Sequence, residues 1–469
     1  MPYYADIAAV RIQSWLARTP KLKGRRGASI LLREATDAHA VEHAGILPAG
    51  VHINTAAGNV DGVVNLQADT PDAAAAGADA VLARLRERLP ALELQAVVSD
   101  EWPDYFLAYP QMKLALAAGD GIEWQPAVPE VPMAQPCTYC GQDPVALTRT
   151  LSPDADQRDQ GVCRDCAARL DAAGRTADAR RVPDVIQRVS EWLEASIPGD
   201  VELTFPQDFG ALAAMGQQTH LATVFIDGNR VGALFEALAN STTTTASGQS
   251  AAPTKESLAH GIDAATQEAL VTGLLAVTGH SEQGEAQLTV PALPHLVGGD
   301  DLLITVGAAE GWTFTRAFLD RFEQVLAQWV ASNKLTVNGP TPTAAAGMVI
   351  HHKNHPFAVT VASADEALSA AKQGTKGDEG AIAWVDVSAT GPAVAGPVRS
   401  TWLTANDAAL AALARVPASQ RAVLTRTPVP ELPDQVRRMG LASSAGPLLR
   451  QGAGVLQDSL AVVRWWRHD

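Results

Sequence analysis

The predicted order of strands and helices limits the folds open to this chain more than any other feature. A short β-rich run at 3–8 and an amphipathic helix come first, and a hairpin at 51–67 follows them. An Ala-rich amphipathic helix at 71–88 then leads into a strand at 92–100. Each element is predicted from apolar residues that recur with helical spacing or alternate as in a strand. The resulting order, β-α-β-β-α-β, is the pattern of a ferredoxin-like domain.

The same order returns in the second half of the chain. It begins with the strand 221–227 and a helix, and it continues after a polar, low-complexity segment at 241–255 that we predict to be a flexible loop. The remaining predicted elements are the helix 257–279, the strands 286–294 and 301–306, the helix 310–332, the strand 343–352, the helix 364–373 and a last strand at 380–388. The second unit differs from the first by one helical insertion. The repeat is therefore one of architecture and not of sequence.

The chain is therefore expected to be an α+β protein with two ferredoxin-like units. Residues 125–136 contain four prolines, a composition typical of an extended linker. The tail from about residue 400 is predicted to be helical. The predicted domains are the first unit at 1–124, a linker with a cysteine segment and helices at 125–200, the second unit at 201–395, and a helical C-terminal domain at 396–469.

Composition and charge exclude several classes of protein. The 36 Lys and Arg against 51 Asp and Glu give a net charge of −15, which argues against a stand-alone, sequence-blind nucleic-acid binder. No apolar run reaches the roughly 18 residues of a membrane-spanning helix, and the N-terminus does not have the pattern of a signal peptide. We expect a soluble, cytoplasmic protein that makes no use of a membrane.

Four cysteines form two CxxC pairs with the spacing CTYC-x22-CRDC. Four thiolates suit tetrahedral Zn²⁺, and a site with four protein ligands is closed and therefore structural. The alternative is four unliganded buried cysteines. The predicted zinc ligands are Cys137, Cys140, Cys163 and Cys166.

A second predicted metal site lies at the hairpin tip Gly298-Gly299-Asp300-Asp301. Glycines at a tight turn permit positive φ and a close approach of the backbone, and acidic residues beside them can hold Mg²⁺. Asp227 ends the first strand of the same unit, which neighbours the hairpin strand in this fold. Crowded carboxylates repel unless cations hold them, as in two-metal phosphoryl-transfer sites. The alternatives to a metal site are a solvated hairpin turn at 298–301 and a helix N-cap at Asp227.

Further residues of this unit are placed to bind phosphate. Gly228 and Asn229 open the following helix, whose N-terminal amides suit a triphosphate. Lys372, near the end of a later helix, is placed to reach a β- or γ-phosphate, with Lys376 as a second candidate. The alternative for each lysine is a solvated residue favoured by the helix dipole.

Three segments of the sequence carry a resemblance to a known family. DGNRVG, HLVGGDDLL and ADEALSAAKQ resemble the palm domain shared by diguanylate cyclases and the large polymerase-cyclase subunit of type III CRISPR effector complexes. GGDD in place of GGDEF favours the CRISPR subunit. So does the layout of two palms flanking a four-cysteine segment, with a helical C-terminal domain after them. The N-terminal segment 6–29 is also similar to the start of that subunit's first palm.

The resemblance implies an activity and a set of site residues. The second palm of that family converts ATP to cyclic oligoadenylate, a second messenger in antiviral defence. Carried over to this sequence, Asp227, Asp300 and Asp301 would bind two Mg²⁺ or Mn²⁺ ions. The nucleotide would be contacted by Gly228, Asn229, Gly298, Gly299 and Lys372. The implied partners are ATP or another NTP and the CRISPR effector subunits with guide RNA and target RNA.

The sequence departs from the family at its N-terminus and in its first palm. Many relatives begin with an HD nuclease domain, whereas this chain starts at the first palm, so no DNase activity is expected. The first hairpin tip has Gly58-Asn59 and a lone Asp61, which indicates a degenerate palm, and Asp6 is interpreted as structural.

Three other groups of residues receive structural interpretations. The cluster His351, His352 and His355 is interpreted as surface histidines. The segment 20–29 is predicted to be a basic loop, either solvated or holding RNA or phosphate through Lys21, Lys23, Arg25 and Arg26. Trp465 and Trp466 are interpreted as packing or subunit contacts.

Two rival functions remain open from the sequence. One is a catalytically silent scaffold subunit, against which the intact Asp227, Asp300 and Asp301 argue. The other is a stand-alone dinucleotide cyclase with two GGDD sites that meet across a homodimer. The preferred base, the ring size of the product and the need for a guide RNA complex stay open as well.

Overall fold

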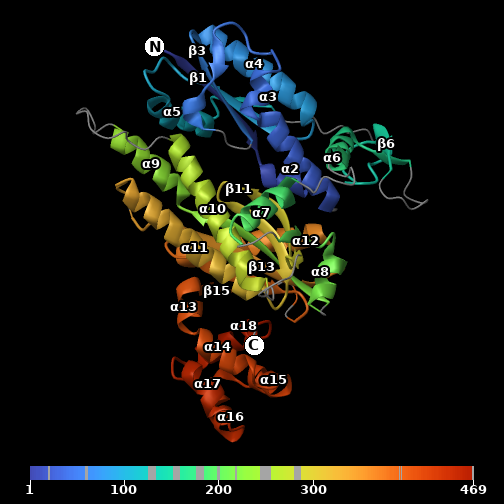
Figure 1. Ribbon diagram of the computed structural model, residues 1–469, viewed down its shortest axis with the longest axis vertical. Helices are drawn as coiled ribbons and strands as arrows, with labels where there is room; N and C mark the ends of the chain where they lie inside the picture. The colour runs from blue at the N-terminus through green and yellow to red at the C-terminus, as the bar shows by residue number, and fades with distance from the viewer. Residues whose placement is uncertain are drawn as a thin grey trace.

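Two sheets with their helices and a C-terminal helical bundle follow one another along the long axis of the molecule (Figure 1). The computed structural model describes residues 1–19, 22–58, 62–124, 134–150, 159–175, 184–197, 201–216, 219–242, 255–278, 287–337, 339–389, 391 and 393–466. The predicted α+β class is confirmed. The predicted linker at 125–136 and the low-complexity loop at 241–255 lie largely outside the described residues. The four-domain division stays a prediction.

The N-terminal sheet has the strand order β2-β3-β1-β4-β5. Its central strand β1 pairs antiparallel with β3 and with β4, as a ferredoxin-like unit requires. The strands are β1 (Tyr3–Val10), β2 (Val51–Ile53), β3 (Val63–Ala68), β4 (Glu93–Val98) and β5 (Ile122–Trp124).

The helices of this unit are α1 (Ile12–Ala17), α2 (Leu22–Thr36), α3 (Ala38–Glu42), the 3₁₀ helix η1 (Thr55–Ala57), α4 (Pro71–Arg88) and α5 (Tyr105–Ala118). Helix α4 packs on β1, β3 and β4. It begins where Thr70 accepts a hydrogen bond from the amide of Ala73 and Pro71 takes the first helical position. Its buried Val81, Leu82 and Leu85 face the sheet.

The predicted basic loop at 20–29 is wrong, because α2 runs through most of it. The two glycines that favoured a loop serve helix packing instead. A Cβ on Gly24 would lie 2.6 Å from the ring of Tyr139, and one on Gly27 would lie 1.9 Å from the carbonyl oxygen of Arg169. The side chain of Arg25 is 7% exposed, and its Nε donates to the carbonyl of Thr19. Burial, with the nearby Arg169, lowers the pKa of Arg25 to about 10. Lys21 and the side chain of Arg26 lie outside the described residues.

The cysteine segment forms a small unit fixed to α1 and α2. Its elements are β6 (Leu147–Arg149), β7 (Gln160–Val162) and α6 (Arg164–Arg175), and α6 packs against α2. Asp165 is 3% exposed, accepts a hydrogen bond from the indole of Trp15 at 3.1 Å, and forms an ion pair with the guanidinium of Arg169 at 2.8 Å. The Arg169 guanidinium also lies 4.3 Å from the Trp15 ring centroid. This buried, paired charge joins the two units.

A short connecting region precedes the central sheet. It contains α7 (Asp184–Glu194), β8 (Glu202–Thr204) and α8 (Phe209–Met215), and β8 pairs parallel with β10 (Gln287–Thr289). The strand predicted at 286–294 is therefore two strands. The backbone leaves one sheet at Val290-Pro291 and enters the other, since proline cannot donate to a ladder.

The central sheet has the order β11-β12-β9-β13-β14-β15. Its strands are β9 (His220–Asn229), β11 (Ala292–Gly298), β12 (Asp301–Gly307), β13 (Thr343–His352), β14 (Ala381–Asp386) and β15 (Ala395–Arg399). Strand β9 pairs antiparallel with both β12 and β13, which repeats the ferredoxin-like order of the first sheet. Strand β14 then pairs parallel with β13, and β15 closes the edge beyond the strand that was predicted to be the last.

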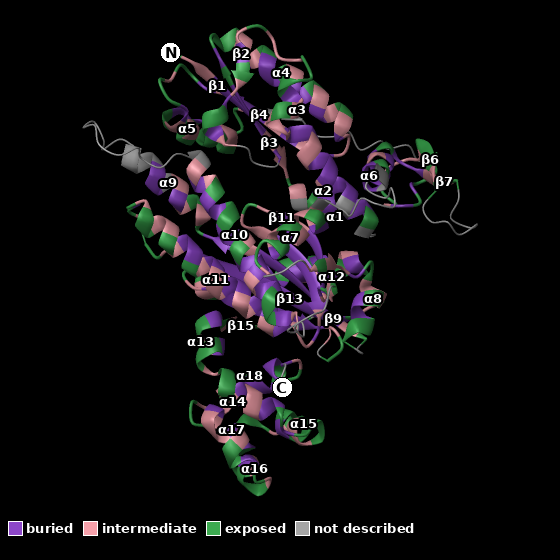
Figure 2. Cartoon of the chain, viewed as in Figure 1, coloured by how far each residue is buried: buried purple, intermediate pink, exposed green. Residues whose placement is uncertain are grey.

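Helices cover both faces of the central sheet and bury most of it (Figure 2). The covering helices are α10 (Lys255–Val277), α11 (Gly311–Ser332) and α12 (Phe357–Thr375), whereas α9 (Val231–Thr242) contacts α10. Helices α10 and α11 pack together over the face that carries Val224 and Ile226. Helix α12 covers the opposite face, which carries Phe225 and Ala345.

The C-terminal bundle contains α13 (Ser400–Ala405), α14 (Asp407–Ala414), α15 (Ala418–Arg426), the 3₁₀ helix η3 (Val429–Glu431), α16 (Leu432–Arg438), α17 (Ala442–Leu449) and α18 (Ala453–Val462). Its last residues dock on the central unit. Trp466 packs against Trp312, and the indole of Trp465 donates to Asp386 at 2.7 Å. These contacts fit the packing role predicted for the two tryptophans.

The interpretation of His351 as a surface residue is wrong, whereas His352 is exposed as expected. Strand β13 continues through both residues and turns His351 inward, where its Nε2 lies 2.8 Å from the hydroxyl of Thr223. Burial lowers the pKa of His351 to about 4. The HHKNH run was misread because its first histidine still lies in a strand whose residues are all buried up to that point.

In the described part of the chain, no helix is both long enough and apolar enough to span a membrane.

Replacing Gly27 by Ala should lower the thermal stability. Alanine is the better helix former by about 1 kcal/mol, but its methyl group would meet the backbone of α6. The matched control is Gly454→Ala in α18, where an added Cβ meets nothing within 4 Å. Thermal unfolding should show a lower Tm for Gly27→Ala and an equal or higher Tm for Gly454→Ala. Equal shifts of the same sign would contradict the close contact between α2 and α6.

Candidate functional site

The pairing of β9 with β12 brings two aspartates of the predicted site to neighbouring strands. Leu302 pairs with Ile226, so Asp301 lies across from Asp227 one residue further along the ladder. Strand β13 flanks β9 on its other side, where Ala345 pairs with Asp227. The carboxylates therefore project from the interior of the sheet rather than from a free loop.

The third aspartate lies in a tight turn. Gly298 pairs with Asp301, so Gly299 and Asp300 form a two-residue connection between β11 and β12. Gly299 has φ +57°, whereas Asp300 does not take a positive φ. A positive φ at the first central residue alone is the signature of a type II′ hairpin, which requires glycine there and permits a side chain at the second position.

Burial and nearby negative charge disfavour the ionised forms of Asp300 and Asp301. Burial and the charge of Asp227 raise the pKa of Asp300 to about 6. Burial, followed by the charges of Asp227 and Asp300, raises the pKa of Asp301 to about 8. Such crowding of oxygen ligands is what a hard divalent cation relieves, so the donor set fits Mg²⁺ or Mn²⁺.

Lys372 from the last turn of α12 reaches the same site. Its ammonium group donates to the carboxylate of Asp227, and to the carbonyl of Gly228 at 3.2 Å. Helix α12 can lie this close to the sheet because a Cβ on Gly347 of β13 would lie only 1.9 Å from the carbonyl oxygen of Ala364. Lys372 thus supplies a positive charge to the carboxylates in this structure.

The predicted nucleotide-binding residues lie in different environments. The expectation that Gly228 and Asn229 open the following helix is wrong, because both are the last residues of β9 and pair with β13. A Cβ on Gly228 would come within 2.5 Å of an oxygen of Asp300, so glycine here lets the turn approach β9. The side chain of Asn229 is 2% exposed and donates to Thr343 at 3.0 Å, which turns it away from the surface. A Cβ on Gly298 would meet nothing within 4 Å, so no packing inside the protein requires glycine at that position. Contacts from these residues to phosphate remain predictions.

Several polar side chains near the site carried no signal in the sequence. Arg230 follows β9 with φ +60° and pairs with Asp378 at 2.7 Å. Arg188 of α7 donates to the carbonyl of Val297 at 2.7 Å, and Thr266 of α10 donates to that of Gly299 at 2.6 Å. All of these contacts join segments far apart in the chain, so no local pattern could have revealed them.

The four cysteines come together as predicted. Their sulfur atoms all lie within 4.8 Å of one another, and three of the four side chains are buried. Within the described residues, no other group of three or more His, Cys, Asp or Glu meets this spacing, so the three aspartates form a more open set. The thiols fit the closed, four-coordinate geometry of a structural zinc site.

The N-terminal sheet has no comparable acidic pair among its described residues at the equivalent position. Asp6 of β1 is 8% exposed and accepts hydrogen bonds from Asn65 and from the hydroxyl of Tyr105, the latter at 2.8 Å. This arrangement agrees with its predicted structural role. Asn59 and Asp61 lie outside the described residues.

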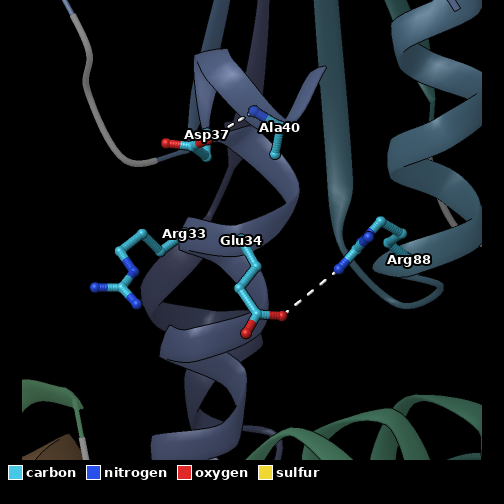
Figure 3. Close-up of a pocket in the computed structure, with 5 residues that line it drawn as sticks. All are labelled: Arg33, Glu34, Asp37, Ala40 and Arg88. Carbon is cyan, nitrogen blue, oxygen red and sulfur yellow. Dashed lines mark hydrogen bonds and ion pairs between the residues drawn. The ribbon is translucent and has the colours of Figure 1, made fainter. Parts of the chain in front are cut away.

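A surface pocket of the N-terminal unit lies away from this site, between α2, α3 and α4. Figure 3 shows that its polar groups serve local contacts. Arg88 lies 3.5 Å from Glu34, and Asp37 caps α3 by accepting from the amide of Ala40. Its lining residues are Arg33, Glu34, Asp37, Ala40 and Arg88. None of them belongs to the predicted site.

A comparison with protein families places the acidic site in a known domain. Residues 220–381 match the model of the Cas10/Cmr2 second palm domain. That span includes β9, the Gly-Gly-Asp-Asp turn and Lys372. Among curated protein sequences, none matches this chain.

Solved structures share the fold of nearly the whole chain. One is a Csm1-Csm4 cassette in complex with cA4, with 14% identity, a TM-score of 0.51, and coverage of 99% of this chain and 69% of that one. Another is a Csm1-Csm4 cassette in complex with cA3, with 13% identity, a TM-score of 0.50, and coverage of 99% and 70%. A third is Csm1 from T. onnurineus, with 14% identity, a TM-score of 0.52, and coverage of 99% and 70%.

Replacing Cys163 by Ser should release zinc and lower stability, because a structural metal contributes directly to the free energy of folding. Metal analysis of the purified chain should give one zinc per molecule for the native protein and less for Cys163→Ser, with a lower Tm. Thr138→Ser in the same loop is the control, since its hydroxyl bond to the Gly161 carbonyl can be kept. An unchanged Tm and metal content in Cys163→Ser would count against a structural zinc site.

Proposed function

We propose that this chain is a nucleotidyltransferase that makes cyclic oligonucleotides from NTP, because residues 220–381 match the model of the Cas10/Cmr2 second palm domain. The observation that carries the proposal is the meeting of Asp227, Asp300, Asp301 and Lys372 where the neighbouring interior strands β9 and β12 lie side by side. Acidic groups that hold divalent cations beside a cation that binds phosphate are the components of a two-metal phosphoryl-transfer site.

Each side chain has a separate task in this site. Asp227, Asp300 and Asp301 would hold Mg²⁺ or Mn²⁺, which activates an attacking hydroxyl and neutralises charge on the phosphates. Lys372 donates a hydrogen bond from its ammonium group to the carboxylate of Asp227 before substrate binds. Its long side chain then reaches a β- or γ-phosphate as a point charge. The carboxylates need no large movement, because two of them project from paired strands.

The chemical step is an in-line displacement at phosphorus. A 3′-hydroxyl of one nucleotide forms a new P–O bond to the α-phosphate of another, and the bond to pyrophosphate breaks. The proton of the attacking hydroxyl passes to solvent as the new bond forms, and pyrophosphate leaves. Repetition of this step lengthens the chain, and attack by the terminal 3′-hydroxyl on the 5′ α-phosphate closes the ring.

Similar proteins support adenine as the base. The cassettes that share this fold are described in complex with cA4 and cA3, which are cyclic oligoadenylates. We therefore propose ATP as the substrate and cyclic oligoadenylate as the product. The same cassettes pair Csm1 with Csm4, so a Csm4-like subunit of an RNA-guided CRISPR complex is the proposed partner of this chain.

The test of the function is product analysis. The purified full chain is incubated with each NTP and with Mg²⁺ or Mn²⁺, alone and with its guide RNA complex and target RNA, and the products are identified by mass spectrometry. Cyclic oligoadenylate from ATP supports the proposal. A different base in the product would change the substrate, and the absence of product under every condition would favour a scaffold.

The double substitution Asp300→Asn and Asp301→Asn should remove synthesis without unfolding the protein. Even the outer-shell partners of metal ligands are worth about 10–100-fold in activity, so loss of two ligands should cost more than about 100-fold. Asp407→Asn is the control, because this carboxylate is exposed in the C-terminal bundle and pairs with Arg316. Product formation by the double variant at the native rate would place the reaction elsewhere.

Replacing Lys372 by Met should weaken ATP binding. A hydrogen bond to a charged group contributes about 1.5–3 kcal/mol, which corresponds to a rise of roughly 10–100-fold in KM. Lys376→Met is the comparison, because Lys376 lies just past the helix end and Lys372, not Lys376, hydrogen-bonds Asp227. Initial rates measured across ATP concentrations separate the two variants. An unchanged KM for Lys372→Met would contradict its proposed contact with phosphate.

A further inference from the structure

Two side chains hold the hairpin tip from different helices. The guanidinium of Arg188 in α7 donates to the carbonyl of Val297, and the hydroxyl of Thr266 in α10 donates to that of Gly299. The two accepting carbonyls lie on either side of Gly298. The turn that carries Asp300 is thus fixed from outside its own strands.

Thr266 departs from what threonine does elsewhere on the same helix. A helical threonine commonly returns its hydroxyl bond to the carbonyl four residues earlier. Thr272 bonds in this way to Glu268, and Thr278 to Leu274. The hydroxyl of Thr266 instead crosses to Gly299 at 2.6 Å, and its residue is 2% exposed. A buried hydroxyl without a hydrogen-bond partner costs free energy. The bond to Gly299 therefore stabilises the packing of α10 against the turn.

The turn needs such an anchor because its own backbone restrains it weakly. Gly298 and Gly299 are adjacent, and glycine has the widest choice of backbone conformations. The peptide unit is planar, so the carbonyl of Gly299 and the amide of Asp300 move together. A hydrogen bond to that carbonyl therefore fixes the orientation in which the chain enters Asp300 and Asp301.

Helix α10 is itself well fixed. It packs along α11, where Arg321 pairs with Glu268 one half-turn from Thr266. It also contacts η1 of the N-terminal unit. Thr266 therefore lies on a helix that packs against both the N-terminal and the central unit. Its hydrogen bond ties the turn to that helix.

We propose that Thr266 is a positioning residue that holds the Gly-Gly-Asp-Asp turn in its reactive conformation. This inference rests on the proposed function for its effect on rate. Thr266 acts through the backbone of Gly299 and does not touch substrate, so its loss should change the rate of the chemical step rather than the affinity for ATP. Misplacement of a reacting group by about 1 Å can cost roughly 100-fold in rate.

The test compares Thr266→Val, which removes the hydroxyl at constant shape, with Thr266→Ser, which keeps it. Thr272→Val is the matched control, because it removes a hydroxyl bond on the same helix that does not reach the turn. Thr266→Val should lower kcat for ATP by about 10–100-fold with KM changed less than about twofold. Thr266→Ser and Thr272→Val should retain native kcat, and all variants should unfold within a few degrees of one another.

Hydrogen exchange provides a readout that does not depend on activity. Amides of residues 297–301 should exchange faster in Thr266→Val than in the native chain, and Thr272→Val should match the native chain. Native kcat and native exchange in Thr266→Val would overturn the proposal, as would an equal loss of kcat in Thr272→Val. If the native chain makes no product while the exchange difference is present, the anchor stands and the proposed function fails.

Discussion

The antiparallel pairing of β9 with β12 is the interaction on which the site depends. It sets Asp301 across from Asp227 by register, at a depth where solvent cannot fully screen their charges. Neighbouring residues either offset the repulsion between these carboxylates or make room for them. Lys372 brings an opposite charge from α12, and Gly228 leaves room for Asp300 to lie against β9. The paired strands therefore hold the aspartates close together, whereas residues of a flexible loop would move apart.

The sequence predicted this part of the molecule well for a physical reason. Strand alternation and turn chemistry are local, so the order of elements in both units and the hairpin at Gly299 follow from short stretches of chain. The neighbouring positions of Asp227 and Asp301 then follow from the ferredoxin-like strand order. The CxxC spacing is equally local, and it predicted the cluster of four thiols.

Residues whose roles depend on packing between distant segments escaped prediction. Gly24 and Gly27 indicated a loop, yet they let α2 pack closely against Tyr139 and α6. His351 is buried because β13, which has the predicted bounds 343–352, is covered on both faces and buries every residue before His352. The hydrogen bond from Thr266 to Gly299 depends on how a helical insertion packs, and nothing in the sequence around Thr266 reveals it.

The most direct measurement is an experimental structure of the full chain with Mn²⁺ and a non-hydrolysable ATP analogue, in which anomalous scattering locates the metal. We expect metal bound by Asp227, Asp300 and Asp301, with the triphosphate beside Gly298 and the ammonium of Lys372 on a phosphate oxygen. Metal and nucleotide bound elsewhere, with Lys372 still on Asp227, would contradict it.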